Sequence, residues 1–270
     1  MLYLITGIIT RIISNSYLNV FQKILTNKGE KSSVVNFYTY LGLSIAGIFF
    51  IESVPYTILP DVLIMGILGA AGNYFIIKAL SIGELSVLAP INSYKPVIAM
   101  FLGVIFLKEI PSLTAVFAIL LIIFGTFFIS GSVKGNSKAI LFRVSALICS
   151  GTEAVFIKKI ILETGSLNTF VLWCLSGLLF SAIPIIAAKH LPKIKSCKYQ
   201  LFLILSVGIM QYSTNFVFER MNVSYALALF QLSTLLSVFL GANIFQEKDL
   251  KRKLIGSIIM IIGAIILILN

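Results

Sequence analysis

The stretch LSIGELSVLAPINSYKPVIAMFLGVIFLKE, residues 80 to 109, decides the fold. Its apolar part, Leu85 to Leu107, is long enough to cross a bilayer, which takes about 20 residues. Pro90, Lys95 and Pro96 interrupt this run near its centre. A lysine at the centre of a membrane helix costs about 2.5 to 3.5 kcal/mol on insertion scales, so it is expected to face a bundle interior or a watery cavity. The stretch therefore predicts a proline-kinked membrane helix with a cation at its middle.

The composition of the whole chain is that of an integral membrane protein. Of the 270 residues 59% are hydrophobic and 11% are charged, whereas soluble domains carry about 25% charged residues. The formal net charge is +11, but the basic residues lie mostly between apolar runs, where they orient helices and meet anionic lipid head groups. No nucleic-acid partner is expected. One histidine and three cysteines without a pairing pattern indicate no metal site, redox role or cofactor.

Ten apolar runs, separated by short polar or Pro/Gly segments, predict an all-α protein with ten transmembrane helices. The apolar N-terminus lacks the basic region of a signal peptide, so the first run is expected to be retained. The joints leave no room for an extramembrane domain, which places the function within the spans. The predicted spans are Leu2 to Leu25, Ser33 to Ile51, Pro60 to Ser81, Leu85 to Leu107, Ser112 to Ile129, Ala139 to Ile161, Leu167 to Ala187, Gln200 to Arg220, Ser224 to Phe245 and Lys253 to Leu269.

The two halves of the chain repeat, which predicts one five-helix unit over residues 1–133 and another over residues 134–270. Because five is odd, the second unit enters the membrane from the opposite side. Inverted repeats of this kind are typical of secondary transporters with a site at the repeat interface. A shift of 138 positions superposes Tyr74 on Tyr212, Ser86 on Ser224, Phe101-Leu102-Gly103 on Phe239-Leu240-Gly241, Glu109 on Glu247 and Gly125 on Gly263.

The order of these residues resembles the EamA-type carriers of the drug/metabolite transporter superfamily. The motif residues are Ala79-Leu80, Pro90, Gly103, Glu109 and Gly125, with their echo Gly241, Glu247 and Gly263. The resemblance covers nearly the whole chain. It implies ten helices in two inverted repeats, a central cavity, and export or exchange of small metabolites. The sequence departs from the family pattern at Ser14-Asn15-Ser16, at Ala228 and at the Lys95-Pro96 pair.

Basic residues predict the orientation of the chain, because short cytoplasmic loops are rich in Lys and Arg. Alternating loops leave only Lys108, Lys158, Lys159 and Arg220 on one side, so the other side is predicted to be cytoplasmic and both termini external. The family resemblance implies the reverse, with both termini in the cytoplasm. The richer side holds Lys23, Lys28, Lys31, Lys134, Lys138, Arg143, Lys189, Lys193, Lys195, Lys198, Lys248, Lys251, Arg252 and Lys253.

Three basic residues remain inside spans: Arg11, Lys78 and Lys95. Lys78 lies near a span end and can extend its ammonium to the interface. Arg11 lies one turn from Asn15 and either lines a cavity or pairs with an acid. Lys95 shares a polar face with Asn92, which predicts cavity lining or a structural ion pair.

The acidic partner expected for Lys95 is Glu153, near the middle of the sixth span. A carboxylate in a low-dielectric site either pairs with a cation or carries a proton, so Glu153 is predicted to bind Lys95 or to couple transport to protons. The alternative is a salt bridge that fixes helix packing.

A polar stripe on the eighth span adds Gln211, Asn215 and Glu219, with Tyr212 alongside. Pseudo-symmetry places Asn73 and Tyr74 of the third span opposite Gln211 and Tyr212. Amides and phenols of this kind fix small polar ligands within apolar pockets. The alternative is that they only join helices, at about 0.6 kcal/mol per hydrogen bond. Gln231 on the ninth span is a further candidate.

These features predict a secondary transporter of a small polar or amphiphilic metabolite, working by alternating access in the cell membrane. Arg11, Lys95 and Glu153 sum to +1, which favours a ligand with an anionic group. Exporters of cationic drugs, with Glu153 as counter-ion, and lipid-handling proteins are alternatives. An intramembrane enzyme is not expected, because HExxH, GxGD and GxSxG are absent and no aspartate is embedded. No phosphate-binding glycine loop suggests ATP, so a gradient or an exchange would supply the energy.

Overall fold

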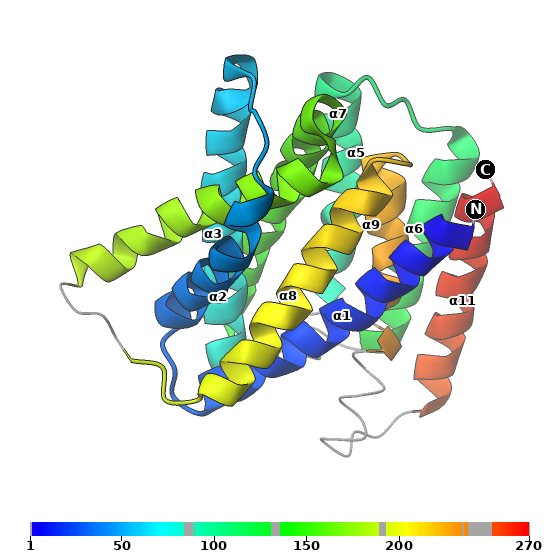
Figure 1. Cartoon of the computed structure of the whole chain (residues 1–270). Helices are drawn as coiled ribbons and strands as arrows, with labels where there is room; N and C mark the ends of the chain where they lie inside the picture. The colour runs from blue at the N-terminus through cyan, green and yellow to red at the C-terminus, as the bar shows by residue number, and fades with distance from the viewer. Residues whose placement is uncertain are drawn as a thin grey trace.

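A computed structural model describes residues 2–83, 88, 90–130, 136–188, 193–233, 235–236 and 250–269 of the chain. All regular secondary structure in these ranges is helical (Figure 1). The elements are α1 (Leu2–Asn27), α2 (Ser32–Gly47), η1 (Ile48–Phe50), η2 (Tyr56–Ile58), α3 (Leu59–Ile82), η3 (Pro90–Tyr94), α5 (Lys95–Phe106), α6 (Leu113–Ser130), α7 (Ser137–Ala187), α8 (Cys197–Phe218), α9 (Val223–Phe230) and α11 (Leu250–Leu269).

Four helical segments of the described chain are long and apolar enough to span a bilayer: Ser32–Phe50, Tyr56–Ile82, Ser137–Ala187 and Cys197–Phe218. Large apolar side chains such as Phe49 are exposed on the outside, while polar ones are buried inside. An apolar outer surface is compatible with contact to lipid tails. The backbone groups are paired within the helices, and the polar side chains can find partners between helices.

Helix α7 breaks in two at Gly165, whose φ of 77° and ψ of 169° are not helical. Glycine adopts this left-handed φ without the steric cost of a Cβ. The break lies between the predicted spans Ala139 to Ile161 and Leu167 to Ala187, and the two halves of α7 diverge from it (Figure 1).

The predicted span Leu85 to Leu107 is not one continuous helix, which corrects the prediction. Residues 90–94 form the 3₁₀ turn η3, and α5 begins only at Lys95. Pro96 is the second residue of α5. A proline is tolerated in the first turn of a helix, where its missing N–H would have no partner, but not further inside, so it favours a helix that begins close to it. Lys95 therefore stands at the start of a short helix and not at the centre of a long one.

Helices from the two halves of the chain pair with one another: α1 with α8, α3 with α7, and α6 with α11. At the last of these contacts a Cβ on Gly125 would lie 2.7 Å from the Gly256 carbonyl, and one on Gly263 would lie 2.8 Å from the Ala118 carbonyl. These two glycines are the repeat-related pair of the sequence, and they let α6 and α11 approach closely. The end of the predicted ninth span, with Gly241, Phe245 and Glu247, lies outside the described residues.

Candidate functional site

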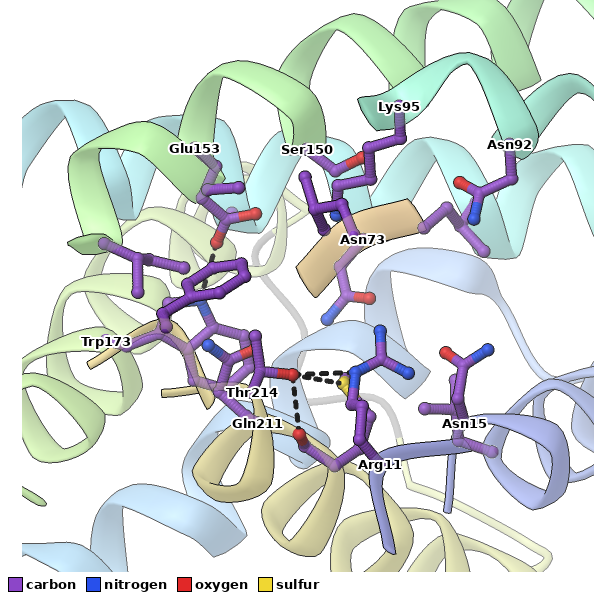
Figure 2. Close-up of a pocket in the computed structure, with 18 of the residues that line it drawn as sticks. Arg11, Asn15, Asn73, Asn92, Lys95, Ser150, Glu153, Trp173, Gln211 and Thr214 are labelled. Atoms are coloured by element: carbon purple, nitrogen blue, oxygen red, sulfur yellow. Dashed lines mark hydrogen bonds between the residues drawn. The ribbon is translucent and has the colours of Figure 1, made fainter. Parts of the chain in front are cut away.

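A polar cavity of about 100 Å³ lies between the two halves of the chain. Its walls come from α1, α3, η3 and α5 of the first half and from α7, α8 and α9 of the second (Figure 2). Among the described residues that line it, three polar side chains are basic and one is acidic, which gives a formal charge of +2. The polar side chains are Arg11, Asn15, Asn19, Asn73, Asn92, Lys95, Arg143, Ser150, Glu153, Trp173, Gln211 and Thr214.

Glu153 is held across the break in α7 by the indole of Trp173. The indole Nε1 donates a hydrogen bond of 2.6 Å to the carboxylate Oε1, and both side chains are buried. The Trp173 ring packs against the Tyr40 ring at 4.8 Å between centroids. Gly69 of α3 closes the other side, because a Cβ there would collide with Oε1 of Glu153. The carboxylate therefore has a fixed position in the cavity wall.

The predicted direct pairing of Glu153 with Lys95 is not present. Both side chains line the cavity, yet no ion pair within 4.0 Å joins them in the part of the chain that the structure describes. Trp173 takes the place of the expected partner, because Gly165 turns the second half of α7 back toward the first. No sequence pattern indicates this contact between two apolar runs.

Arg11 projects into the cavity from α1. Its Nε donates to Thr214 Oγ1 of α8 at 2.7 Å, and its guanidinium carbon lies 4.8 Å from the centroid of the Phe230 ring. Nη1 is buried and has no hydrogen-bond partner among the described residues. Asn15, one turn away, lines the same cavity and donates to Ser233 Oγ at 2.9 Å. Arg11 thus lines a cavity, and no acid of the described ranges forms an ion pair with it.

Arg143 is a cavity residue that sequence reasoning placed in a loop, where it counted toward orientation. It lies inside α7, and its Nε donates to the Leu88 carbonyl at 3.2 Å. Arg143 is the seventh residue of α7, a position that an interfacial residue could also occupy. Its place in the sequence therefore does not distinguish a cavity residue from an interfacial one. The charge of the cavity is consequently +2 instead of the expected +1.

Tyr74, Tyr212 and Asn215 lie outside this cavity, which corrects their predicted place beside Asn73 and Gln211. Adjacent residues of a helix point about 100° apart, so the tyrosines face elsewhere. Tyr74 lines a separate, mostly apolar pocket with Phe75 and Phe180, and Tyr212 is 44% exposed.

Asn215 is fully buried and forms a hydrogen bond beside the break in α7. Its Nδ2 donates to the Ser166 carbonyl at 3.2 Å, and its Oδ1 accepts from Gln211 Nε2 at 2.9 Å. Glu219, the last member of the predicted stripe, pairs with Arg220 at 2.6 Å and is partly exposed. Of the stripe only Gln211 reaches the cavity.

The sequence matches the EamA-like transporter family over residues 2–131 and 137–269. The chain belongs to this family. Members are membrane transporters of the drug/metabolite type and not enzymes, and the resemblance seen in the motifs is thereby confirmed. A solved structure described only as "Crystal structure of protein" is similar to this EamA-family chain, with a TM-score of 0.71, 15% identity and 98% of each chain covered. At this identity the likeness shows the fold alone. No curated protein matches the sequence.

A contact between the two EamA repeats, here termed the clasp, lies next to the cavity. It consists of Glu109, Lys158 and the Val223 amide. The Lys158 Nζ donates to the Phe218 carbonyl and lies 4.0 Å from Glu109 Oε1. The Val223 N–H donates to Glu109 Oε2 at 2.9 Å. Phe218 also lines the cavity, so the clasp borders it directly.

Both side chains of the clasp are largely withdrawn from solvent, with 13% of Glu109 and 9% of Lys158 exposed. Burial raises the pKa of Glu109, while the Val223 amide and the Lys158 charge oppose the shift. The prediction of orientation counts Lys158 as a loop residue, whereas it lies within α7. The direction in which its side chain points only follows from the packing of α7 on α8.

Proposed function

We propose that this EamA-family protein is a secondary transporter that moves a small polar metabolite through the central cavity by alternating access. The observation that carries the proposal is one charged cavity whose walls come from both repeats. Relative motion of the repeats would change the side from which such a site is open. The cavity volume of about 100 Å³ is below the roughly 300 to 1,000 Å³ of drug-sized pockets, which supports a small solute.

The proposed architecture is ten membrane spans in two inverted five-helix repeats, divided near residue 133. Counting α7 as two segments at Gly165 gives ten α-helical segments, besides the 3₁₀ turns, in the described chain. The proposed location is the cell membrane, where basic loop residues would meet anionic lipids.

The clasp is the proposed gate at one end of the cavity. A second ion pair between the repeats, Lys159 Nζ to Asp61 Oδ2 at 2.7 Å, joins α7 to the start of α3. Opening this end would require the repeats to part here. The contacts are few and polar, and parting the repeats would expose the largely buried side chains of the clasp to water, which would take over their hydrogen bonds.

Glu153 is the proposed coupling residue, because it is the acidic side chain among the residues that line the cavity. It would exchange a proton in step with the solute, and no ATP would be needed. A cationic solute that uses Glu153 as counter-ion is the second candidate, and it is favoured by the same carboxylate.

Transport can be tested without knowing the solute. Proteoliposomes loaded with a deproteinised, ¹³C-labelled cell extract are incubated, and the labelled compounds released are identified by mass spectrometry. Proteoliposomes with the wild type are expected to release a small set of polar solutes that protein-free liposomes, loaded with the same extract, retain. Proteoliposomes with Lys95→Ala are expected to release none of these solutes. Lys78→Gln, which removes a basic residue of α3 outside the cavity, is the matched control. A wild-type release profile identical to that of the protein-free liposomes would refute the proposed function.

A further inference from the structure

We infer that Arg11 is the anchor for an anionic group, a carboxylate or a phosphate, on the solute. The inference rests on the proposed function and deepens it, since it states the chemical class of the solute and which residue selects it. Three observations carry it. They are the geometry of the Arg11 guanidinium, the distribution of charge around the cavity, and the hydrogen bond that Trp173 already donates to the Glu153 carboxylate.

The Arg11 guanidinium is held in place but not saturated. Thr214 accepts from Nε, and Thr214 is itself fixed, because its hydroxyl donates to the Met210 carbonyl at 2.8 Å. The Phe230 ring lies against the same group. Nη1 is nonetheless buried without a hydrogen-bond partner among the described residues, and the Arg11 side chain is 9% exposed. Buried polar atoms are nearly always paired, so an orphan donor in a cavity wall indicates a group that a ligand completes.

The shape of the guanidinium specifies the ligand group. Its planar fork matches the two oxygens of a carboxylate or phosphate, which it binds bidentately. Figure 2 shows the head group of Arg11 pointing into the cavity, with Asn73 and Asn15 labelled on either side of that space. Their amides can donate to the remaining oxygens of an anion.

The surrounding charges favour the same sign of ligand. Lys95 and Arg143 line the cavity together with Arg11. Lys95 is also the first residue of α5, and a helix N-terminus adds a partial positive charge. Glu153 does not neutralise Arg11, since no ion pair within 4.0 Å joins them in the described chain and its Oε1 is occupied by Trp173. An anionic ligand would thus balance the positive charge of the residues that line the cavity.

The test measures binding to the purified full-length protein by thermal stability. The probes are anionic, neutral and cationic pools of small molecules from a deproteinised cell extract, separated by ion exchange. Defined pairs accompany them: lactate with lactamide, and glycerol 3-phosphate with glycerol. The lactate and glycerol 3-phosphate arms distinguish a carboxylate from a phosphate. Ligands that bind the folded state raise the melting temperature by mass action.

The anionic pool is expected to stabilise the wild type and the Lys78→Gln control equally. In Arg11→Gln its apparent affinity is expected to fall about 10- to 100-fold, the loss of one to two charge-assisted hydrogen bonds. Arg11→Lys keeps the charge without the fork and is expected to lie between the two. Because Arg11→Gln could also disturb folding, its elution as a single species and its melting temperature without ligand are recorded first.

The possible outcomes separate this inference from the proposed function. Stabilisation by the cationic or neutral pool, with none by the anionic pool, overturns the role of Arg11 but leaves a carrier. Anion binding that Arg11→Gln and Arg11→Lys both retain in full also overturns it. Absence of an effect from every pool removes the solute site itself, and with it both proposals.

Discussion

Trp173 Nε1 lies 2.6 Å from Glu153 Oε1, and this hydrogen bond joins the two halves of α7 across the break at Gly165. It fixes a carboxylate in the wall of the cavity beside three cations. An indole N–H can only donate, so the carboxylate oxygen Oε1 is its acceptor. The pair therefore links the fold of α7 directly to the electrostatics of the proposed site.

Removal of the indole donor should be costly. In Trp173→Phe the ring packing on Tyr40 is largely kept, but Glu153 loses its hydrogen bond. Leaving a buried polar group unpaired costs about 1 to 3 kcal/mol, so the free energy of unfolding should fall by that amount in a detergent unfolding titration. In a protein that already carries Glu153→Gln, the Trp173→Phe substitution should lower the free energy of unfolding clearly less, because the charged partner of the indole is gone. Equal costs in the two backgrounds would contradict the role of this contact.

Neutralising the carboxylate should uncouple transport from protons. Glu153→Gln keeps the shape of the side chain and an oxygen acceptor for Trp173, but it cannot release a proton. Once a transported solute is identified, its flux in proteoliposomes should depend on an imposed pH gradient in the wild type and not in the variant. Unchanged pH dependence in Glu153→Gln would show that Glu153 is not the coupling residue.

Lys95→Ala should abolish transport and leave the fold intact. The substitution removes a cavity charge but places a good helix former at the start of α5. Solute flux should drop to the level of empty liposomes, while the melting temperature without ligand changes little. Wild-type flux would remove Lys95 from the site, and a large loss of stability would make it a structural residue instead.

A methyl group at Gly69 should displace the carboxylate. A Cβ at this position would collide with Glu153 Oε1 and lie 3.2 Å from Trp173 Nε1, so Gly69→Ala should lower both stability and transport. Gly47→Ala is the matched control, since its Cβ would meet only Val171 methyl groups at 3.7 Å and beyond. If both variants behave alike, the packing of Gly69 against the pair is irrelevant.

The clasp should respond to pH through Glu109. Because burial raises its pKa, the clasped state holds the Glu109 proton more tightly than a state in which this side chain is exposed. This contribution to stability is complete below the ordinary glutamate pKa and is lost as pH rises through the raised value. Melting temperature recorded against pH should show this fall in the wild type and lack it in Glu109→Gln. Identical profiles would show that Glu109 does not titrate in the clasp.

The sequence by itself determined the class of the protein and its family. Apolar runs near 20 residues long leave no soluble alternative, and the repeated order of glycines and glutamates is a local pattern that survives without coordinates. Arg11, Asn73, Asn92, Lys95, Glu153 and Gln211 were also predicted as site residues and do share one cavity. The physical reason is the cost of polar groups in lipid, which forces them toward the bundle interior.

Only the tertiary structure decided which of these groups meet. Periodicity shows which residues share a helix face, but it does not show how a face is rotated toward its neighbours. The sequence therefore groups Tyr74 and Tyr212 with the site residues, whereas the structure places them outside this cavity. The left-handed backbone of Gly165 and the 3₁₀ turn before Lys95 set the directions of α7 and α5. Those directions bring Trp173 to Glu153, turn Arg143 inward and place Lys158 in the clasp. Each contact joins residues far apart in sequence or across a break, where packing of whole helices outweighs any local preference.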